Sequence, residues 1–387
     1  MVLGLIIGFG GLDVMSFSIR VGLAVVGFEL SVKFNVCVFI RGGVIESIEG
    51  YGSCSESSLG SPSLALLPQP GNAHVHSADH AFPEYGIHMS LRDLVAPPHG
   101  LKHKLLESTP GEDLVKAISE FYDLAWRMGL GILFDFREGG GLGCMLARKA
   151  RELLPRGLRV VIQGRPGPMW PEGCEGLGVS SPLDYNVEFL REMALKHKPA
   201  MAHVAEDPEA RAAGDLERAV EVGLDAIVHG THLSGGDLEV LKERGMALVL
   251  CPRSNMWHSI GVPPVAEALK KGVTIAFGSD NAAWQTPDVW AEAQTALLLA
   301  RAQGLKEEWT AKRILEAIMI TPYLLAGAKP PAIVEGGAAK MIIVNLEGTG
   351  VLRARNHHYA ILKRVGPWNT IARIDGDGIA WLTAASR

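Results

Sequence analysis

Apolar and polar positions follow one pattern near both ends of the chain. Short apolar runs separated by glycine-rich turns predict β-hairpins. In the first part they lie at 20–28, 31–40 and 44–48, and after residue 330 they lie at 340–345, 359–365 and 370–375. Two β segments that flank a larger unit can join each other. We therefore expect residues 1–66 and 331–387 to form a small composite β-sandwich domain.

A different pattern fills the middle of the chain, where short apolar strands alternate with amphipathic helices. The expected strands are 66–73, 131–136, 158–163, 176–179, 199–204, 226–228, 247–250 and 274–278. The expected helices lie near 112–128, 143–154, 183–197, 208–222, 236–244, 263–271, 287–302 and 307–319. Eight strands, each followed by a helix, predict an α/β fold with a (β/α)8 TIM barrel over residues 67–330. A long loop, from about 77 to 111, precedes the first helix and is a candidate cover for the barrel.

Composition and charge narrow the class of protein. The chain has 387 residues, of which 48% are hydrophobic and 20% charged, so it can bury a large core. Its formal net charge is -5, and no basic excess is available for a nucleic-acid partner. The apolar first twelve residues are too short for a membrane span, so we expect an upstream extension or a first strand and no membrane partner. Met15 is an alternative start.

Five cysteines are scattered along the chain without a CxxC pair. An odd number in this arrangement favours a reducing cytoplasm over a disulfide framework. Cysteine is therefore a poor candidate for a metal ligand, and we expect a cytoplasmic protein.

Metal-binding side chains follow several of the expected strands. His74 and His76 end the first strand, and residues two apart on a strand point to one face, so both rings can reach one ion. His203 ends the fifth strand and Asp280 the eighth. Three neutral imidazoles and one carboxylate suit zinc, and also serve iron or manganese. A catalytic metal keeps one position for water and lowers the pKa of that water.

Further polar residues near the same strand ends are candidates for catalysis or substrate binding. Glu206 lies just beyond His203 and is placed to carry a proton between water and substrate. Arg137 and Arg165 follow the second and third strands, where they either clamp an anionic substrate group or form structural ion pairs. Trp284 lies near a barrel end, where it either stacks on a planar ring or packs in the core.

The motifs at these strand ends resemble those of the amidohydrolase superfamily. Residues 70–76 are similar to its first-strand motif, and residues 228–233, 251–255 and 278–280 resemble its deaminase and chlorohydrolase branch. That branch includes cytosine, guanine and adenosine-analogue deaminases and triazine hydrolases. Residues 339–344 are similar to the C-terminal segment of the branch, with Met341 where Asp is usual. The likeness extends from about residue 36 to 380.

The resemblance implies one divalent ion, with ligands at His74, His76, His203 and Asp280. Binuclear members of the superfamily often bridge two metals with a carboxylated lysine at the end of strand four. The expected fourth strand here has no lysine, which favours a mononuclear site, and Glu175 is the alternative bridging residue.

The resemblance also implies the roles of the remaining polar residues. Glu206 would be the proton shuttle, Asp280 would double as a base, and His229 would orient the water or the developing oxyanion. His232, three residues further on, competes with His229 for that role and is otherwise a candidate substrate contact.

The expected reaction is hydrolysis of a non-peptide C–N bond in a small molecule. Deamination of an amino-heterocycle or a nucleoside-like compound leads, and hydrolysis of another C–N or C–Cl bond, as in chlorohydrolases and cyclic amidine hydrolases, is the alternative. A non-catalytic binding protein on the same fold is a remote alternative. The branch also makes a homodimer plausible, although no residue pattern here demonstrates one.

Overall fold

A seven-stranded sheet joins the two end segments of the chain. The computed structural model describes residues 16–382 except 97–98 and 168, so the expectation for the first twelve residues lies outside the described part. The sheet has the order β16-β15-β14-β4-β1-β2-β3, and β14 pairs antiparallel with β4. Its strands are β1 (Ser16–Val26), β2 (Ser31–Arg41), β3 (Val44–Gly50), β4 (Leu59–Pro68), β14 (Lys340–Asn345), β15 (Thr370–Asp375) and β16 (Gly378–Trp381). The end segments thus meet in one sheet, and the expected β-sandwich is not confirmed.

One expected strand of the C-terminal segment is wrong. Residues 359–365 lie mostly in helix α14 (His357–Arg364), which begins where the Asn356 side chain accepts a hydrogen bond from the Tyr359 backbone N–H. Ala360, Ile361 and Leu362 form a short buried run in this helix. A short apolar run has the same appearance in a strand and in a buried helix, so periodicity did not separate the two.

A curled parallel sheet of nine strands forms the larger part of the described chain, in the order β12-β11-β10-β9-β8-β7-β6-β5-β13. The strands are β5 (Gly71–His76), β6 (Ile132–Arg137), β7 (Arg159–Gly164), β8 (Gly176–Val179), β9 (Ala200–Val204), β10 (Ala226–His229), β11 (Ala247–Leu250), β12 (Ile275–Phe277) and β13 (Asp280–Asn281). The two outermost strands, β12 and β13, are consecutive in sequence and separated only by Gly278 and Ser279. The arrangement is TIM-barrel-like and follows the expected strands closely.

The first expected barrel strand contains the change from one sheet to the other. β4 ends at Pro68 and β5 begins at Gly71, so the expected strand 66–73 is two strands of different sheets. A Cβ atom at Gly71 would lie 2.4 Å from Ile132 and 2.7 Å from Pro322. Glycine is therefore required where the chain enters the larger sheet, because no side chain fits there.

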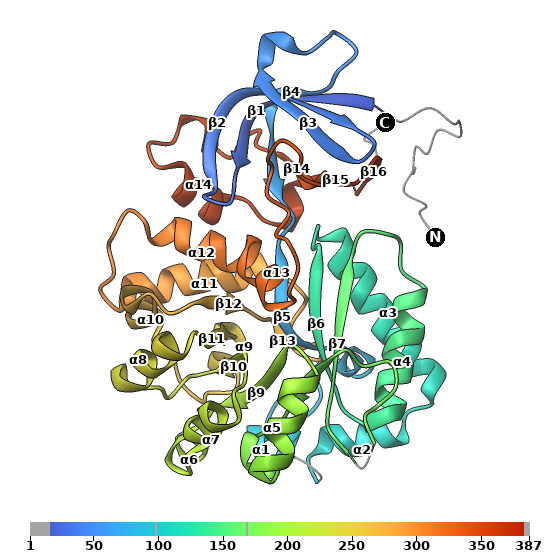
Figure 1. Cartoon of the computed structure of the whole chain (residues 1–387), viewed down its shortest axis with the longest axis vertical. Helices are drawn as coiled ribbons and strands as arrows, with labels where there is room; N and C mark the ends of the chain where they lie inside the picture. Colours follow the sequence, from blue (N-terminus) through green and yellow to red (C-terminus); the bar gives the residue numbers. More distant parts are fainter. Residues whose placement is uncertain (1–15, 97–98, 168, 383–387) are drawn as a thin grey trace.

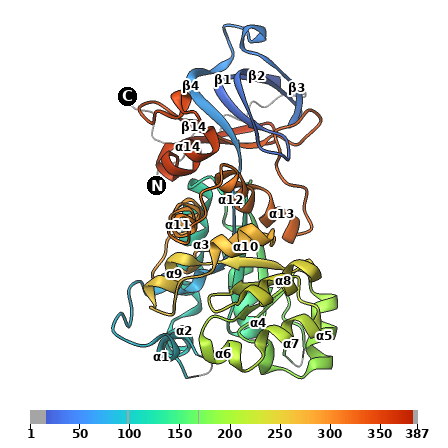
Figure 2. The same ribbon diagram turned by 90° about the vertical axis from the view of Figure 1, so that its left-hand side faces the viewer.

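Helices surround the curled sheet (Figure 1; Figure 2). They are α3 (Gly111–Arg127), α4 (Gly140–Glu152), α5 (Val187–Lys196), α6 (Pro208–Ala212), α7 (Asp215–Val222), α8 (Gly235–Arg244), α9 (Pro252–Trp257), α10 (Val265–Lys271), α11 (Val289–Ala302), α12 (Thr310–Met319) and α13 (Thr321–Leu325). Each amphipathic helix buries its apolar face, as α3 does with Ile118, Phe121 and Tyr122. The long loop after β5 contains α1 (Leu91–Val95) and α2 (Leu101–Ser108). Both lie at the end of the molecule opposite the seven-stranded sheet (Figure 1).

Two disulfides contradict the expectation from the cysteine pattern. Cys37 in β2 is bonded to Cys54, and Cys144 in α4 is bonded to Cys174. Their Cα atoms lie 5.6 Å and 5.4 Å apart, respectively, within the usual range for disulfides. Sequence spacing did not reveal these pairs because tertiary folding brings their residues together. Cys251 is buried and unpaired.

Within residues 16–382, outside the two short gaps, no helix is both long enough and apolar enough to cross a membrane.

Candidate metal centre

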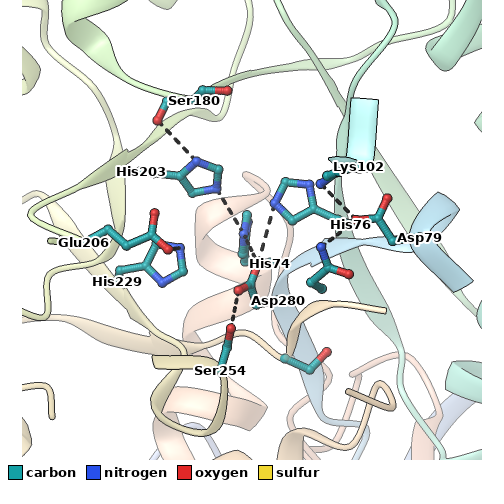
Figure 3. Close-up of polar contacts among 12 residues, drawn as sticks. His74, His76, Asp79, Lys102, Ser180, His203, Glu206, His229, Ser254 and Asp280 are labelled. Carbon is teal, nitrogen blue, oxygen red and sulfur yellow. Dashed lines mark hydrogen bonds and ion pairs between the residues drawn. The ribbon is translucent and has the colours of Figure 1, made fainter. Parts of the chain in front are cut away.

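Three strands of the curled sheet bring the predicted ligands to one place, and a fourth strand places His229 beside them (Figure 3). β5 carries His74 and His76, β9 carries His203, and β13 begins at Asp280. His229 ends β10 beside them. Because the carboxyl ends of parallel strands meet at one end of a barrel-like sheet, these side chains converge although they are far apart in sequence.

Short distances join the donor atoms of the cluster. Asp280 Oδ1 lies 3.3 Å from His74 Nε2 and 3.6 Å from His76 Nε2. The Nε2 atoms of His74 and His203 lie 3.3 Å apart. One ligand atom from each of His74, His76 and His203 lies within 4.8 Å of the other two, and the same holds for His74, His229 and Asp280. Nitrogen and carboxylate donors that face each other in this way fit one divalent metal ion.

The protonation of the histidines also suits metal binding. Burial lowers the pKa of His76 to about 3 and that of His203 well below its ordinary value. Burial likewise lowers the pKa of His74. His203 Nδ1 lies 3.2 Å from the Ser180 carbonyl oxygen, to which it can donate, leaving Nε2 free to bind a metal. Neutral rings with a free nitrogen are the form that binds metal.

Three strand ends in the cluster have an unusual backbone. The φ angle is 49° at Ala205, 74° at His229 and 63° at Asp280. Residues other than glycine rarely adopt this left-handed backbone conformation. The packing around these three residues must therefore hold the conformation in place. The strain occurs where each strand turns into the cluster.

Asp280 is held in its ionised form. Burial opposes ionisation, but the hydrogen bond with His74 and the neighbouring imidazoles hold the pKa of Asp280 well below its usual range. The Ser254 hydroxyl donates a hydrogen bond of 2.5 Å to Asp280 Oδ2. Ser254 therefore orients one carboxylate oxygen while the other faces the histidines.

Glu206 and His229 form a second pair beside the ligands. Glu206 Oε1 lies 3.5 Å from His229 Nε2, and the Asn255 side-chain amide lies 3.0 Å from His229 Nδ1. Burial raises the pKa of Glu206, although the nearby His229 opposes this shift. A carboxyl group with a raised pKa can hold a proton closer to neutral pH and release it to a reacting group.

A cavity of about 680 Å³ opens onto the cluster. Arg165 and Trp284, two candidates for substrate contact, line it. His232 does not line it, and its Nε2 lies 2.6 Å from the Ile260 carbonyl oxygen. Arg137 is also outside the lining and is buried among carboxylates. Glu175 pairs with a surface arginine instead of joining the cluster.

Arg137 belongs to a structural network and does not line the cavity. Its guanidinium lies 3.2 Å from Asp135 and 3.3 Å from Glu138. Asp135 in turn accepts hydrogen bonds from Ser77 and from the Tyr122 hydroxyl. Of the two roles considered for Arg137, the geometry therefore favours the structural ion pair.

Sequence reasoning assigned no role to Lys102, which is buried at the cavity wall. Its ammonium lies 2.7 Å from Glu138 and 3.1 Å from Asp79. Burial opposes its charge, but these two carboxylates raise the pKa of Lys102. Conversely, burial opposes the charge of Glu138, but Lys102 and His76 lower the pKa of that carboxyl. No pattern in the polar helix α2 distinguishes Lys102 from its neighbours, so only the tertiary structure identifies it.

Comparison with known proteins agrees with this geometry. The amidohydrolase family matches residues 70–372. A putative aminohydrolase from Methanothermobacter thermautotrophicus is 30% identical over 289 residues, which cover 68% of this chain and 75% of the relative. A 5-methylthioadenosine/S-adenosylhomocysteine deaminase from Halobacterium salinarum is 32% identical over 148 residues, which cover 37% of this chain and 34% of that protein.

A solved structure with the same fold is the adenosine deaminase from Xanthomonas campestris with bound zinc. The TM-score is 0.75 at 16% identity, and the match covers 93% of this chain and 92% of that one. The family match extends over most of the chain, from the start of β5 into β15 of the seven-stranded sheet. The chain therefore belongs to the amidohydrolase family, and it is an enzyme that hydrolyses C–N bonds.

Proposed function

We propose that this enzyme deaminates a planar amino-heterocycle or a nucleoside-like compound, with one zinc ion held by His74, His76, His203 and Asp280. The observation that carries the proposal is the convergence of three neutral imidazoles and one ionised carboxylate at a cavity of about 680 Å³. This donor set suits zinc better than the harder divalent ions. A bound ion of this kind supplies a water whose pKa is lowered toward neutrality.

The residues around the cluster would move the protons of the reaction. Asp280, ionised and 8% exposed, would accept a proton from the attacking water. Glu206, whose pKa burial raises, would deliver a proton to the leaving nitrogen. The water oxygen bonds to the amino-bearing carbon, the C–N bond breaks, and ammonia leaves. His229, whose Nε2 lies 3.5 Å from Glu206 Oε1, would orient the attacking water by a hydrogen bond to its oxygen.

Aromatic side chains in the cavity wall support the proposal of a planar, ring-shaped substrate. Trp284 lies in its wall with its ring centroid 4.7 Å from that of Tyr85 and 4.6 Å from that of His258. Such an aromatic group can stack on a planar heterocycle. The guanidinium of Arg165, which lines the cavity, would bind a polar or anionic substituent.

Several finer predictions accompany this function. We propose that the curled sheet is a closed (β/α)8 barrel, completed through residues 275–281. The division into 67–330 and a composite domain of 1–66 with 331–387 stays a prediction. The same holds for a cytoplasmic location, for a homodimer and for the expectation that no nucleic acid binds.

Ammonia release tests the proposed reaction. Zinc-loaded protein is incubated with amino-purines, amino-pyrimidines, adenosine analogues and amino-triazines, and ammonia is measured by an enzyme-coupled assay. We expect release from at least one compound, together with its hydroxylated product, and a loss of about 10²-fold or more in Glu206→Gln. No turnover of any of these compounds would contradict the deaminase proposal. Chloride release from chlorotriazines without ammonia would instead identify the C–Cl reaction on the same site.

A further inference from the structure

Glu138 is the meeting point of four cationic or donor side chains. It directly follows β6 and is only 4% exposed. Its Oε1 atom lies 2.7 Å from the Lys102 ammonium, 2.8 Å from His76 Nδ1 and 3.4 Å from the Arg165 guanidinium. Its Oε2 atom lies 3.3 Å from Arg137. A buried carboxylate with so many partners is held in one position.

The contact with His76 bears directly on the metal cluster. His76 Nδ1 lies 2.8 Å from Glu138 Oε1, and His76 Nε2 lies 3.6 Å from Asp280 Oδ1. A carboxylate next to Nδ1 favours the ring form that carries its proton there. That form leaves the Nε2 lone pair free toward Asp280 and fixes the ring orientation.

Lys102 connects the contact between Glu138 and His76 to helix α2. It belongs to α2, in the long loop after β5, and is 3% exposed. Its ammonium also lies 3.1 Å from Asp79, whose carboxylate accepts a 2.5 Å hydrogen bond from the Asn281 amide. Asn281 follows Asp280 in β13. The ion pairs of Lys102 therefore connect α2 with residues that contact or adjoin two of the proposed ligands. Figure 3 shows Lys102 beside Asp79 and His76.

We propose that Glu138 and Lys102 are positioning residues for His76, and that through Lys102 the binding of a divalent ion is coupled to the packing of α2 against the metal centre. This inference rests on the proposed metal site. Glu138 orients the His76 ring through its contact at Nδ1, and Lys102 holds Glu138 in place. Because coupling between two sites is reciprocal, an ion that fixes His76 also stabilises the α2 contact.

Metal affinity tests the positioning role. The zinc affinities of wild type, Glu138→Gln and Lys102→Met are measured by competition with a chromogenic chelator. We expect zinc to bind about tenfold or more weakly in both variants. Lys104→Met is the matched control, because Lys104 is exposed on the same helix, and its affinity should equal that of wild type. Equal zinc affinity in wild type and folded Glu138→Gln would overturn the proposal.

Two further readouts separate positioning from a general loss of stability. Cobalt-substituted Glu138→Gln should show shifted visible absorption bands, because the His76 ring changes its orientation at the ion. Lys102→Arg, which keeps the charge, should recover most of the zinc affinity lost in Lys102→Met. An unchanged cobalt spectrum would contradict the role of Glu138. If Lys102→Met fails to fold, Glu138→Gln and Lys102→Arg decide the question.

Hydrogen exchange tests the coupling to α2. In wild type, zinc should slow amide exchange in residues 101–108, and in Lys102→Met this response should be lost. An equal response to zinc in both proteins would contradict the coupling. His203→Ala separates a failure of the proposed metal site from a failure of the positioning role alone. If wild type and His203→Ala both bind no zinc, the proposed metal site fails. If wild type binds zinc and Glu138→Gln binds it equally well, only the positioning role fails.

Discussion

The proposed metal centre lies between two walls that come from different parts of the chain. One wall, the strand-end wall, consists of the strand ends that carry His74, His203 and Asp280 on β5, β9 and β13. The other comes from the long loop after β5, where α2 contributes the buried Lys102. The strand-end wall supplies the proposed ligand atoms, whereas the loop wall supplies the positive charge of Lys102, which pairs with the Glu138 carboxylate beside His76. We infer that the strand-end wall carries the reacting groups, whereas the loop wall helps to fix the position of those groups.

Asp280→Asn removes the largest contribution of the strand-end wall. The substitution keeps the size of the side chain but removes the negative charge that faces His74 and His76. Because Asp280 is proposed both as ligand and as base, we expect kcat/KM to fall by at least about 10⁴-fold. The measurement is ammonia release with the best substrate of the panel. Activity within tenfold of wild type would exclude Asp280 from the reaction.

Glu206→Gln separates proton transfer from metal binding. Glu206 lies beside His229 and is absent from both groups of potential ligand atoms. We expect kcat to fall by about 10²–10⁴-fold while the zinc content stays unchanged. Steady-state kinetics and elemental analysis of the same preparation test this. Loss of zinc from the variant would show that Glu206 supports the ion instead of moving a proton.

Glu292 should make the stability of the fold depend on pH. It lies in α11, a helix that contacts α9 and β12 next to the strand-end wall. It is fully buried in α11, where burial raises its pKa to about 8 although Arg253 opposes the shift. Between its ordinary pKa and about 8, the folded state keeps a proton that the unfolded state has lost. The free energy of unfolding attributable to Glu292 therefore falls as the pH rises through that window.

Glu292→Gln should remove that pH dependence. The glutamine oxygen can still accept the hydrogen bond from the Arg253 backbone N–H. Urea unfolding at about pH 5 and about pH 9 should show wild type losing roughly 2–4 kcal/mol more stability than the variant. Glu239→Gln, a substitution of an exposed residue on α8, is the control. Identical pH profiles of wild type and Glu292→Gln would refute the burial argument.

Trp284→Leu has the smallest expected effect and probes substrate binding. Trp284 lines the cavity, and its indole N–H donates to the Tyr85 carbonyl oxygen at 3.2 Å. Losing an aromatic contact with a planar substrate should raise KM about tenfold. His232→Gln should leave KM unchanged, because His232 contacts the Ile260 carbonyl oxygen and does not line the cavity. The opposite result would reverse the roles of these two residues.

The strand-end wall could be predicted from the sequence because its geometry follows periodicity. Short apolar runs located the strands, and the residues that end them had to meet at one end of a parallel sheet. This pattern predicts that His74, His203 and Asp280 lie together. It could not predict the left-handed backbone at His229 and Asp280, which depends on the packing around each strand end.

The loop wall and the end segments were less predictable. Lys102 lies in a polar helix, and its burial results from contacts with Asp79 and Glu138. Helix α14 was expected as a strand because a short apolar run suits both structures. The disulfide between Cys144 and Cys174 joins positions 30 residues apart, and sequence spacing alone did not indicate their pairing. In each case tertiary contacts decided the outcome.

The most direct test of the account is the zinc stoichiometry of the purified chain. Elemental analysis of wild type after zinc loading and removal of free metal should give one zinc per chain. The same measurement on His203→Ala, in which one imidazole ligand is missing, should give much less than one. One zinc per chain in wild type and none in the variant is the predicted result. Two zinc ions in wild type, or full retention in His203→Ala, would contradict a mononuclear centre built from these four residues.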